Sequence, residues 1–362
     1  MILGIKVWRN KRLICKLDYS GILKIKDKTA EVFLPSKIVP EVIDNTILRI
    51  GPIEFDVREH SDFIYNSNDV VHAWNKYSSE YNLDKVALLL LSRETFNYLA
   101  FGFIPATPRL ISIARLPYII KLACNIPNFN SHVKQYRSEI RETSRKGTQI
   151  LFSNFSKSLN YINQLEKAIA SLEAITSFAI NAKELGYDVE FSDKKKGYDM
   201  LLNGIPTEVK HVHDSITKLD LNSKFDQPVP LTLERIVADL ATLLYRRKYI
   251  QRAIEQNAKI LSVDVTSTVS GAALAAYKSL SHDDSLSLKH QLSKAIDMAQ
   301  RGKFSVIFYT RIGKAALTVP LESISMFEKI AHVMSKAPRL SIWSRFQDLS
   351  RFFYFKTIIS LP

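Results

Sequence analysis

Cysteine is scarce in this chain. The only two, Cys15 and Cys124, lie far apart and form no CxxC pair, so the sequence predicts neither a disulfide framework nor a structural zinc site. No phosphate-cradling Gly-rich loop is present, because the segment RIGKAA at 311–316 lacks the Walker spacing, and no serine nucleophile elbow occurs. These absences argue against ATP hydrolysis and against an elbow-type serine nucleophile.

Long uncharged stretches are absent as well. The most apolar region, residues 86–122, is interrupted by prolines and by charged residues, among them Arg93, Glu94 and Arg115. No window therefore reaches the roughly 18 uncharged residues of a membrane span. The N-terminal segment MILGIKVWRNKRLICK is broken by charges and has no secretory apolar core. We expect a soluble cytoplasmic protein with no membrane partner.

Positively charged residues outnumber negatively charged ones in this chain. The chain has 362 residues, with 50 Lys and Arg against 36 Asp and Glu, and a formal net charge of +14. Its length suggests two domains with a small extra element. Excess positive charge favours a polyanionic partner, with nucleic acid first and an acidic membrane surface second.

Residues 1–66 are expected to form a β-rich N-terminal domain. Short alternating segments between 2 and 59 are separated by turn residues, which predicts a small antiparallel sheet or an open barrel. Basic residues crowd its first half: Lys6, Arg9, Lys11, Arg12, Lys16, Lys24, Lys26 and Lys28. Such a surface could follow a phosphate backbone, or it could be an ordinary solvated sheet face.

A mainly helical connecting region, 67–150, is expected next. Basic residues recur at helical spacing on one face of the segment 134–146. They are Lys134, Arg137, Arg141 and Arg145. We interpret this segment as a basic helix that leads into the following domain and contacts nucleic acid, with a purely structural linker as the alternative.

The segment GYDMLLNGIPTEVKHV, 197–212, predicts a β-hairpin. The Asn-Gly pair at 203–204 supplies the two positive φ angles of a type I′ turn. A two-residue loop there makes Asp199 and Glu208 direct cross-strand neighbours, with Cβ atoms roughly 4.5–5.5 Å apart. Pro206 cannot donate to the ladder, so a slipped register is the alternative.

Three charged residues of this hairpin form a candidate metal site. Lys210 lies two residues beyond Glu208 and faces the same side of the strand, whereas Val209 faces a core. The carboxylates of Asp199 and Glu208 repel each other and lose solvation. The pair is explained if a divalent cation lies between the two groups. A solvated strand face is the alternative interpretation.

The surrounding elements are predicted in the order helix, strand, strand, strand, helix, strand. Apolar residues keep helical spacing from 162 to 185, Gly186 ends that helix as a C-cap, and the strand YDVEF follows. Glu173 lies in mid-helix between small alanines, which let the helix approach a sheet closely. A second long helix, 231–258, and the strand KILSVDVTS come after the hairpin.

In this order and spacing, residues from about 157 to 267 resemble the PD-(D/E)xK nuclease superfamily, with Tyr198 where the name-giving Pro would be. The resemblance implies a mixed-sheet, restriction-endonuclease-like α/β core. It also implies that Asp199 and Glu208 are metal ligands and that Lys210 is the catalytic lysine.

The resemblance implies two further metal ligands. They are the carboxylate of Glu173, with Glu166 one heptad earlier as the alternative, and the main-chain carbonyl of Val209. The implied ion is Mg²⁺ or Mn²⁺, which would polarise a phosphodiester and lower the pKa of an attacking water. Lys210 would orient that water or neutralise charge on the phosphoryl oxygens. DNA is the substrate expected by analogy with the family.

We therefore expect a metal-dependent nuclease, with a DNA endonuclease as the favoured form. One alternative is a nuclease gated by a ligand or partner, acting on DNA or RNA, with residues 1–150 as the sensor. The other is a non-catalytic nucleic-acid-binding or assembly subunit whose acidic residues are vestigial. The intact Asp199, Glu208 and Lys210 argue against the last.

Other basic and imidazole groups lie near the hairpin in sequence. The loop residues Lys194, Lys195 and Lys196, and Arg246 and Arg247 on the second helix, could hold phosphates or be only solvated. The two histidines of the segment KHVHD, at 211 and 213, face away from the lysine before them. We interpret both as core or substrate-side residues and not as metal ligands.

The nuclease-like domain is expected to span 151–315. A helix over 285–303 and the strand FSVIFYTR would extend its sheet. The tail, 316–362, mixes aromatic residues with Arg and Lys, which can stack bases but which we expect to dock onto the core or a partner. A homodimer or a partner protein bound through the N-terminal domain or this tail remains open.

Overall fold

The described part of the chain forms two compact units. A computed structural model describes residues 39–50, 66–101, 107–151, 153–192, 197–213 and 248–324, together with short strands between 6 and 56 and isolated helical positions between 233 and 244. The first unit comprises Met1–Cys124 and Val133–Glu173, and the second lies within Asn125–His132 and Ala174–Phe355. The fold is mixed α/β with a mixed sheet, as the sequence predicts, and the restriction-endonuclease-like form of the core stays a prediction.

The first unit begins with two antiparallel sheets, where the sequence predicted one sheet or barrel. Strands β2, β1, β4 and β3 pair in that order, and β5, β6 and β7 form a separate three-stranded sheet. The bounds of β1 to β7 are Lys6–Arg9, Arg12–Leu13, Gly21–Ile25, Lys28–Val32, Glu41–Val42, Ile47–Ile50 and Ile53–Asp56. The β-rich character of this segment is confirmed.

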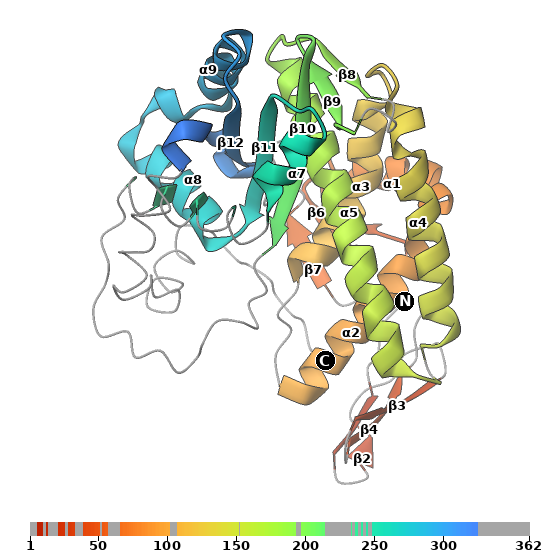
Figure 1. Cartoon of the computed structure of the whole chain (residues 1–362). Helices are drawn as coiled ribbons and strands as arrows, with labels where there is room; N and C mark the ends of the chain where they lie inside the picture. Colours follow the sequence, from red (N-terminus) through yellow and green to blue (C-terminus); the bar gives the residue numbers. More distant parts are fainter. Residues whose placement is uncertain are drawn as a thin grey trace, which may run out of the picture. The chain divides into compact units, whose positions relative to one another are not determined.

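Helices follow in the first unit (Figure 1). They are α1 (Ser67–Tyr81), α2 (Leu83–Phe101), α3 (Thr107–Ala123), most of α4 (Phe129–Gln149) and the first part of α5 (Phe155–Glu184). Two ion pairs with little exposure, Arg93 to Glu166 and Arg115 to Glu173, join α2 and α3 to α5. Helices thus occupy the region that the sequence predicts to be mainly helical, and α4 contains the predicted basic segment.

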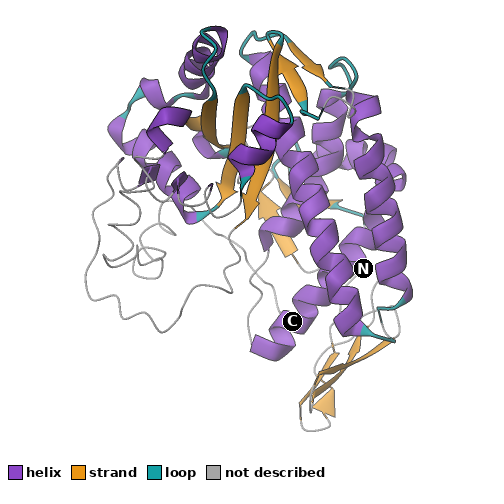
Figure 2. Cartoon of the chain, in the orientation of Figure 1, coloured by secondary structure: helices purple, strands orange, loops and turns teal. Residues whose placement is uncertain are grey.

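The second unit is built around a six-stranded mixed sheet, with helices packed beside the strands (Figure 2). Its order is β13-β12-β11-β10-β9-β8. Strands β8, β9 and β10 are antiparallel neighbours, β10, β11 and β12 run parallel, and β13 is antiparallel to β12. The bounds of β8 to β13 are Val189–Phe191, Met200–Leu202, Ile205–His213, Ile260–Ser267, Ser305–Thr310 and Ala315–Pro320.

The β9–β10 hairpin has the register that the Asn-Gly pair predicts. Asn203 and Gly204 have φ angles of 49° and 76°, as a type I′ turn requires. The ladder pairs are Leu202 with Ile205, Leu201 with Pro206 and Met200 with Thr207. Pro206 has no N–H to donate to the ladder, but it lies near the start of β10, where proline is tolerated. Its carbonyl still accepts a hydrogen bond from the main-chain N–H of Lys259 at 2.8 Å.

Helix α5 ends in the predicted glycine cap. Gly186 has a φ of 90°, a conformation that costs little only for glycine. The main-chain N–H of Tyr187 donates to the carbonyl of Ala182 at 3.1 Å, and that of Gly186 donates to Lys183 at 3.0 Å. These two bonds make a Schellman motif, which turns the chain from α5 into β8.

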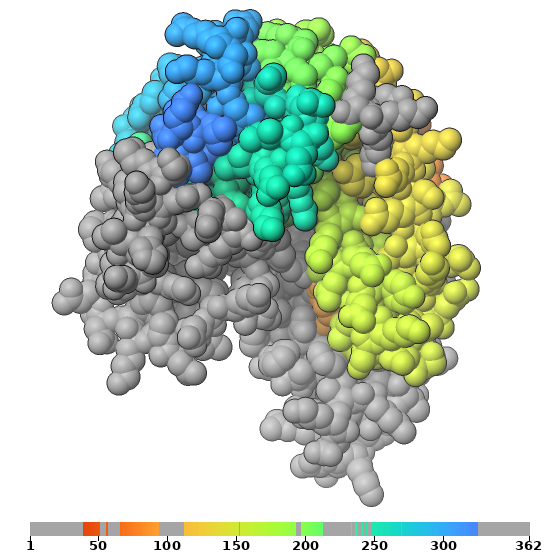
Figure 3. Space-filling view, viewed as in Figure 1, coloured from red at the N-terminus to blue at the C-terminus, as the bar shows by residue number. Residues whose placement is uncertain are grey.

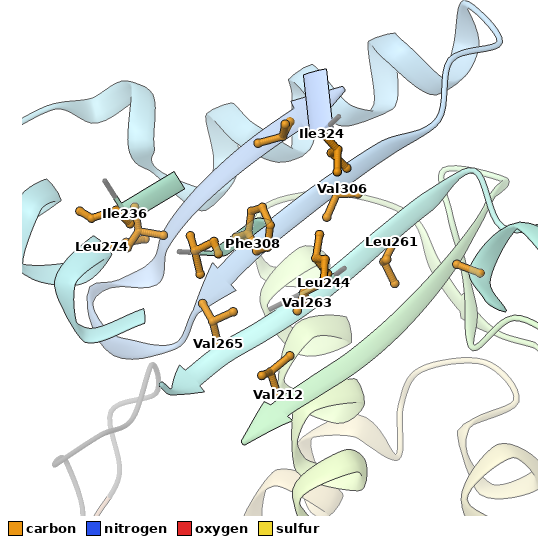
Figure 4. Packing of buried hydrophobic residues seen from close by; sticks show 14 of the residues in the cluster. Val212, Ile236, Leu244, Leu261, Val263, Val265, Leu274, Val306, Phe308 and Ile324 are labelled. Carbon is orange, nitrogen blue, oxygen red and sulfur yellow. The ribbon is translucent and has the colours of Figure 1, made fainter. Parts of the chain in front are cut away.

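A buried apolar cluster covers one face of the six-stranded sheet (Figure 4). Its strand members alternate along β11 and β12, as one sheet face requires: Leu261, Val263, Val265, Val306 and Phe308. The second part of α5 packs on the other face. There the Tyr309 hydroxyl accepts a hydrogen bond from Asn181 at 2.8 Å, and the Tyr309 ring meets that of Phe178 edge-on at 5.9 Å.

The helix predicted over 231–258 is interrupted, which corrects the expectation of one long helix. Isolated positions between 233 and 244 are helical, but Lys248 has a φ of 53° and α7 (Tyr249–Glu255) begins directly after it. No Gly or Pro marks this break, so apolar periodicity alone predicts an unbroken helix. Helix α7 crosses in front of β10 and β11 in Figure 1 and forms part of the visible surface in Figure 3, coloured teal.

After β11 the chain adds α8 (Val269–Ser281) and α9 (Leu288–Gln300). The predicted helix and strand of this region correspond to α9 and β12, and β12 extends the sheet as expected. Neither α8 nor β13 was predicted, and β13 carries the sheet past residue 315. None of the helices in the described ranges is long and apolar enough to cross a membrane.

Candidate functional site

Asp199 lies in the bend just before β9, where hydrogen bonds fix both its main chain and its side chain. Its main-chain N–H donates to the carbonyl of Thr207 at 3.2 Å, and its carbonyl accepts from the N–H of Ser192 at 2.9 Å. Its side-chain Oδ2 accepts a hydrogen bond from the main-chain N–H of Val209 at 2.8 Å. The carboxylate is therefore fixed against the middle of β10.

Glu208 is buried beside Asp199, with 1% of its surface exposed. Burial first, and then the negative charge of Asp199, raise the pKa of the Glu208 carboxyl to about 8 against the opposing charge of Lys210. Its Oε2 is buried and accepts no hydrogen bond from the described residues. The hydrogen bond from the Val209 N–H to Oδ2 of Asp199 places that carboxylate at the residue next to Glu208, as the hairpin register predicts.

Lys210 completes the group on the same strand face. Its Nζ donates a hydrogen bond to Oε1 of Glu208, and its side chain is 28% exposed, against 2% for Glu208. The ammonium therefore lies between the buried carboxylate and solvent. The structure brings Asp199, Glu208 and Lys210 together, with the lysine as the most accessible of the three.

His132 is a member of this site that the sequence did not indicate. It lies in the first turn of α4 and is 1% exposed. Its Nε2 is 3.7 Å from Oδ1 of Asp199, and its Nδ1 is 3.2 Å from the carbonyl oxygen of Ser192. The imidazole packs 5.1 Å from the ring of Phe191 on β8. No local motif links this histidine to Asp199, so only the tertiary structure could reveal it.

Glu173 is engaged with another partner. It is 2% exposed, and its Oε1 is 3.8 Å from Nη2 of Arg115. Glu173 belongs to the first unit, whereas Asp199 and Glu208 belong to the second. The alternative helix carboxylate, Glu166, forms an ion pair in the first unit as well. Participation of either glutamate in the site stays a prediction.

The site of the described structure is thus a pair of carboxylates. Across the described ranges, no group of three or more His, Cys, Asp or Glu side chains is placed to hold a metal ion. A pair still fits Mg²⁺, which is often bound by one or two carboxylates with water and substrate phosphate as the remaining ligands. The buried Oε2 of Glu208 is an oxygen that a cation would satisfy, and the charge of a cation would offset the repulsion from Asp199. The Val209 carbonyl as a further ligand stays a prediction.

The basic face of α4 is only partly available to a ligand. Arg141 and Arg145 are exposed, and α4 lies on the visible surface in Figure 3, coloured yellow. Arg137 instead forms an ion pair with Glu80 at 3.2 Å, and its guanidinium lies 5.4 Å from the ring centre of Tyr81. Arg137 therefore helps to hold α4 against α1.

Five further predicted contacts to nucleic acid are outside the described residues. They are Lys194, Lys195, Lys196, Arg246 and Arg247. The aromatic tail beyond residue 324 is outside them too. The predictions for these segments stay predictions.

A second charged cluster lies on the opposite face of the sheet. His211 Nδ1 and Arg311 Nη2 are 3.0 Å and 3.5 Å from the same oxygen of Asp264. Complete burial opposes ionisation of Asp264, but the charge of Arg311 and hydrogen bonds from His211 and Thr266 hold its pKa below the usual range. These bonds tie together the ends of β10, β11 and β12. The side chain of His211 is thus mostly buried, at 8% exposure, and contacts Asp264 instead of the hairpin carboxylates.

The chemistry of the hairpin site follows from its donors. Carboxylate oxygens bind hard cations, and the partly exposed ammonium of Lys210 can meet an anionic substrate. Any assignment of function rests on this geometry, because no family model, curated protein or solved structure matches the chain.

Proposed function

We propose that this chain is a metal-dependent nuclease that hydrolyses phosphodiester bonds, with DNA as the favoured substrate. One observation carries the proposal: buried Glu208 lies beside Asp199 and contacts Lys210. Two adjacent carboxylates with little solvent are unfavourable by themselves and become favourable when a hard cation joins them. The succession of α5, β8, β9, β10 and β11 also supports the resemblance to the PD-(D/E)xK superfamily.

Each residue of the hairpin has a part in this mechanism. Asp199 and Glu208 would hold Mg²⁺ or Mn²⁺, which supplies Lewis-acid polarisation of the phosphate and a more acidic water. The Val209 N–H keeps the Asp199 carboxylate turned toward Glu208. Lys210 presents its ammonium to solvent, where it can hold the attacking water or offset charge that builds on the phosphoryl oxygens.

The charge of the chain supports a polyanionic substrate. The net charge is +14, and Arg141 and Arg145 are exposed on one helix of the first unit. Phosphate contacts of this kind provide affinity without sequence information. The choice of DNA over RNA rests on the resemblance alone.

A non-catalytic nucleic-acid-binding subunit is the second candidate. It is favoured by the direct contact between Lys210 and Glu208, which partly compensates the buried charge without any metal. In that case the basic surfaces would bind nucleic acid, and the hairpin would be a structural element. Cleavage assays separate the two candidates.

The test is a cleavage assay of the full chain on labelled single-stranded, duplex and branched DNA and on RNA, with Mg²⁺ or Mn²⁺. Asp199→Asn and Lys210→Gln are the test variants. Glu190→Gln is the matched control, because Glu190 is an exposed carboxylate on neighbouring β8. Metal-dependent cleavage by the wild type and the control, but not by the test variants, supports the nuclease. Binding without cleavage of any substrate supports the second candidate.

A further inference from the structure

His132 connects the candidate site to β8. The carbonyl oxygen of Ser192, just after that strand, lies 3.2 Å from its Nδ1, and Oδ1 of Asp199 lies 3.7 Å from its Nε2. The ring is almost fully buried and packs against Phe191. It therefore has little freedom to turn, and its two nitrogens face two different oxygens of the second unit. Both oxygens are acceptors, so the arrangement suits a ring that is protonated on both nitrogens. The 3.7 Å between Nε2 and Oδ1 is an ion-pair distance and is longer than a hydrogen bond.

The two oxygens of the Asp199 carboxylate face different groups. Oδ2 accepts the hydrogen bond from the Val209 N–H, and Oδ1 faces His132. A carboxylate offers about four lone-pair directions, so each oxygen keeps one for a cation. The hydrogen bond on Oδ2 and the ion-pair contact on Oδ1 together restrict rotation of the carboxylate more than the hydrogen bond alone would.

We propose that His132 is a positioning residue that holds the Asp199 carboxylate in the orientation needed to bind the metal. This inference rests on the proposed function, because it assumes that Asp199 is a ligand. Groups that hydrogen-bond a ligating carboxylate fix its orientation, and losing one typically weakens metal affinity 10–100-fold. His132 acts through Asp199 and needs no contact with the metal or the substrate.

Two amide substitutions test the contacts of the two His132 nitrogens one at a time. The amide nitrogen of asparagine lies near the place of Nδ1, so His132→Asn keeps a donor for Ser192 and removes the one facing Asp199. The amide nitrogen of glutamine lies near the place of Nε2, so His132→Gln keeps a donor for Asp199. A role in packing alone predicts the same effect for both variants, whereas positioning of Asp199 predicts different effects.

The measurement is the affinity of the full chain for Mn²⁺ by calorimetry at one pH, without nucleic acid. We expect His132→Gln to bind Mn²⁺ within about threefold of the wild type and His132→Asn to bind about 10–100-fold more weakly. Thermal unfolding of the metal-free variants checks that both are folded. Equal affinities of the two variants, whether both normal or both weak, would overturn the inference. If the wild type binds no Mn²⁺, the proposed function fails and the role of His132 fails with it.

A second measurement does not require a histidine variant to fold. In the metal-free protein, the ¹⁵N resonances of the His132 ring report its two contacts separately. We expect Asp199→Asn to move the Nε2 signal and to leave Nδ1 nearly unchanged, and Glu190→Gln to move neither. If the Nε2 resonance does not shift in Asp199→Asn, the contact between His132 and Asp199 is absent. That result would overturn the role of His132 even if the chain is a nuclease.

Discussion

The carboxylate of Asp199 accepts a hydrogen bond from the main-chain N–H of Val209 at 2.8 Å. The β9–β10 ladder ends at the pair of Met200 with Thr207, so this N–H faces a position where the neighbouring strand has already bent away. The Asp199 side chain accepts the hydrogen bond that the main chain of a neighbouring strand would otherwise accept. The bond satisfies a buried main-chain donor and also places a second carboxylate beside Glu208.

The first prediction concerns the chemistry. Asp199→Asn should abolish detectable cleavage, because a neutral amide is a poor ligand for Mg²⁺. Lys210→Gln should lower the rate constant of the cleavage step by about 100–1,000-fold, since it removes one group that stabilises developing charge. Single-turnover cleavage at saturating enzyme measures both effects. Full activity in either variant, relative to Glu190→Gln, would contradict the assignment of the site.

The second prediction concerns the metal. Cleavage should require Mg²⁺ or Mn²⁺ and stop with EDTA, and adding Mg²⁺ in excess should restore it. Ca²⁺ should support substrate binding with little turnover, because its looser geometry positions water poorly. Cleavage and binding are followed separately on the same oligonucleotide. Cleavage that continues after thorough chelation would rule out the mechanism.

The third prediction concerns pH and the metal-free protein. The pKa of Glu208 is raised from 4.5 to about 8 in the folded chain. Between these values the unfolded chain loses a proton that the folded chain keeps, so the free energy of unfolding should fall as pH rises from about 4.5 to about 8. The size is at most roughly 1.4 kcal/mol for each unit of the pKa difference.

The variant Glu208→Gln provides the control for this pH dependence. It has no titrating group at this position, so its free energy of unfolding should vary less across the same window and should exceed that of the wild type at pH 8. Denaturant titrations in EDTA at several pH values measure both chains. Parallel curves for the two chains would show that Glu208 titrates normally.

The fourth prediction concerns Glu173. Glu173→Ala removes the carboxylate beside the buried guanidinium of Arg115, which is 3% exposed. Breaking a buried ion pair typically costs about 3–5 kcal/mol, so the melting temperature should fall clearly. If Glu173 only stabilises the first unit, the folded variant should bind Mn²⁺ as the wild type does. A large loss of Mn²⁺ affinity in a variant that is still folded would instead make Glu173 a ligand, as the family resemblance implies.

The fifth prediction concerns affinity for nucleic acid. Arg141→Gln with Arg145→Gln should weaken binding to all sequences alike and make the log–log salt dependence shallower by about 0.9 for each phosphate of duplex DNA that the variant no longer binds. The control is Lys289→Gln with Lys303→Gln, which removes the same charge from exposed positions of the second unit. Equal reductions in the two double variants would show that only net charge matters. Arg137 is left intact because its contact with Glu80 is structural.

The amino-acid sequence by itself determined the hairpin and the cap before it. Asn203 and Gly204 prefer the positive φ angles of the type I′ turn, and the alternation of side chains then fixes which residues of β9 and β10 are paired. Gly186 ends α5 for the same kind of local reason. These features depend on near neighbours in the chain, which is why the sequence alone predicts that Asp199, Glu208 and Lys210 lie together.

Only the tertiary structure decided which distant groups meet these residues. His132 reaches Asp199 because the first turn of α4 packs against β8, and Glu173 meets Arg115 through the packing of α3 on α5. The left-handed residue Lys248 interrupts a sequence whose apolar spacing is helical throughout. Apolar periodicity records which face of an element is buried, but not what that face is buried against, since contacts between elements depend on how the whole chain packs.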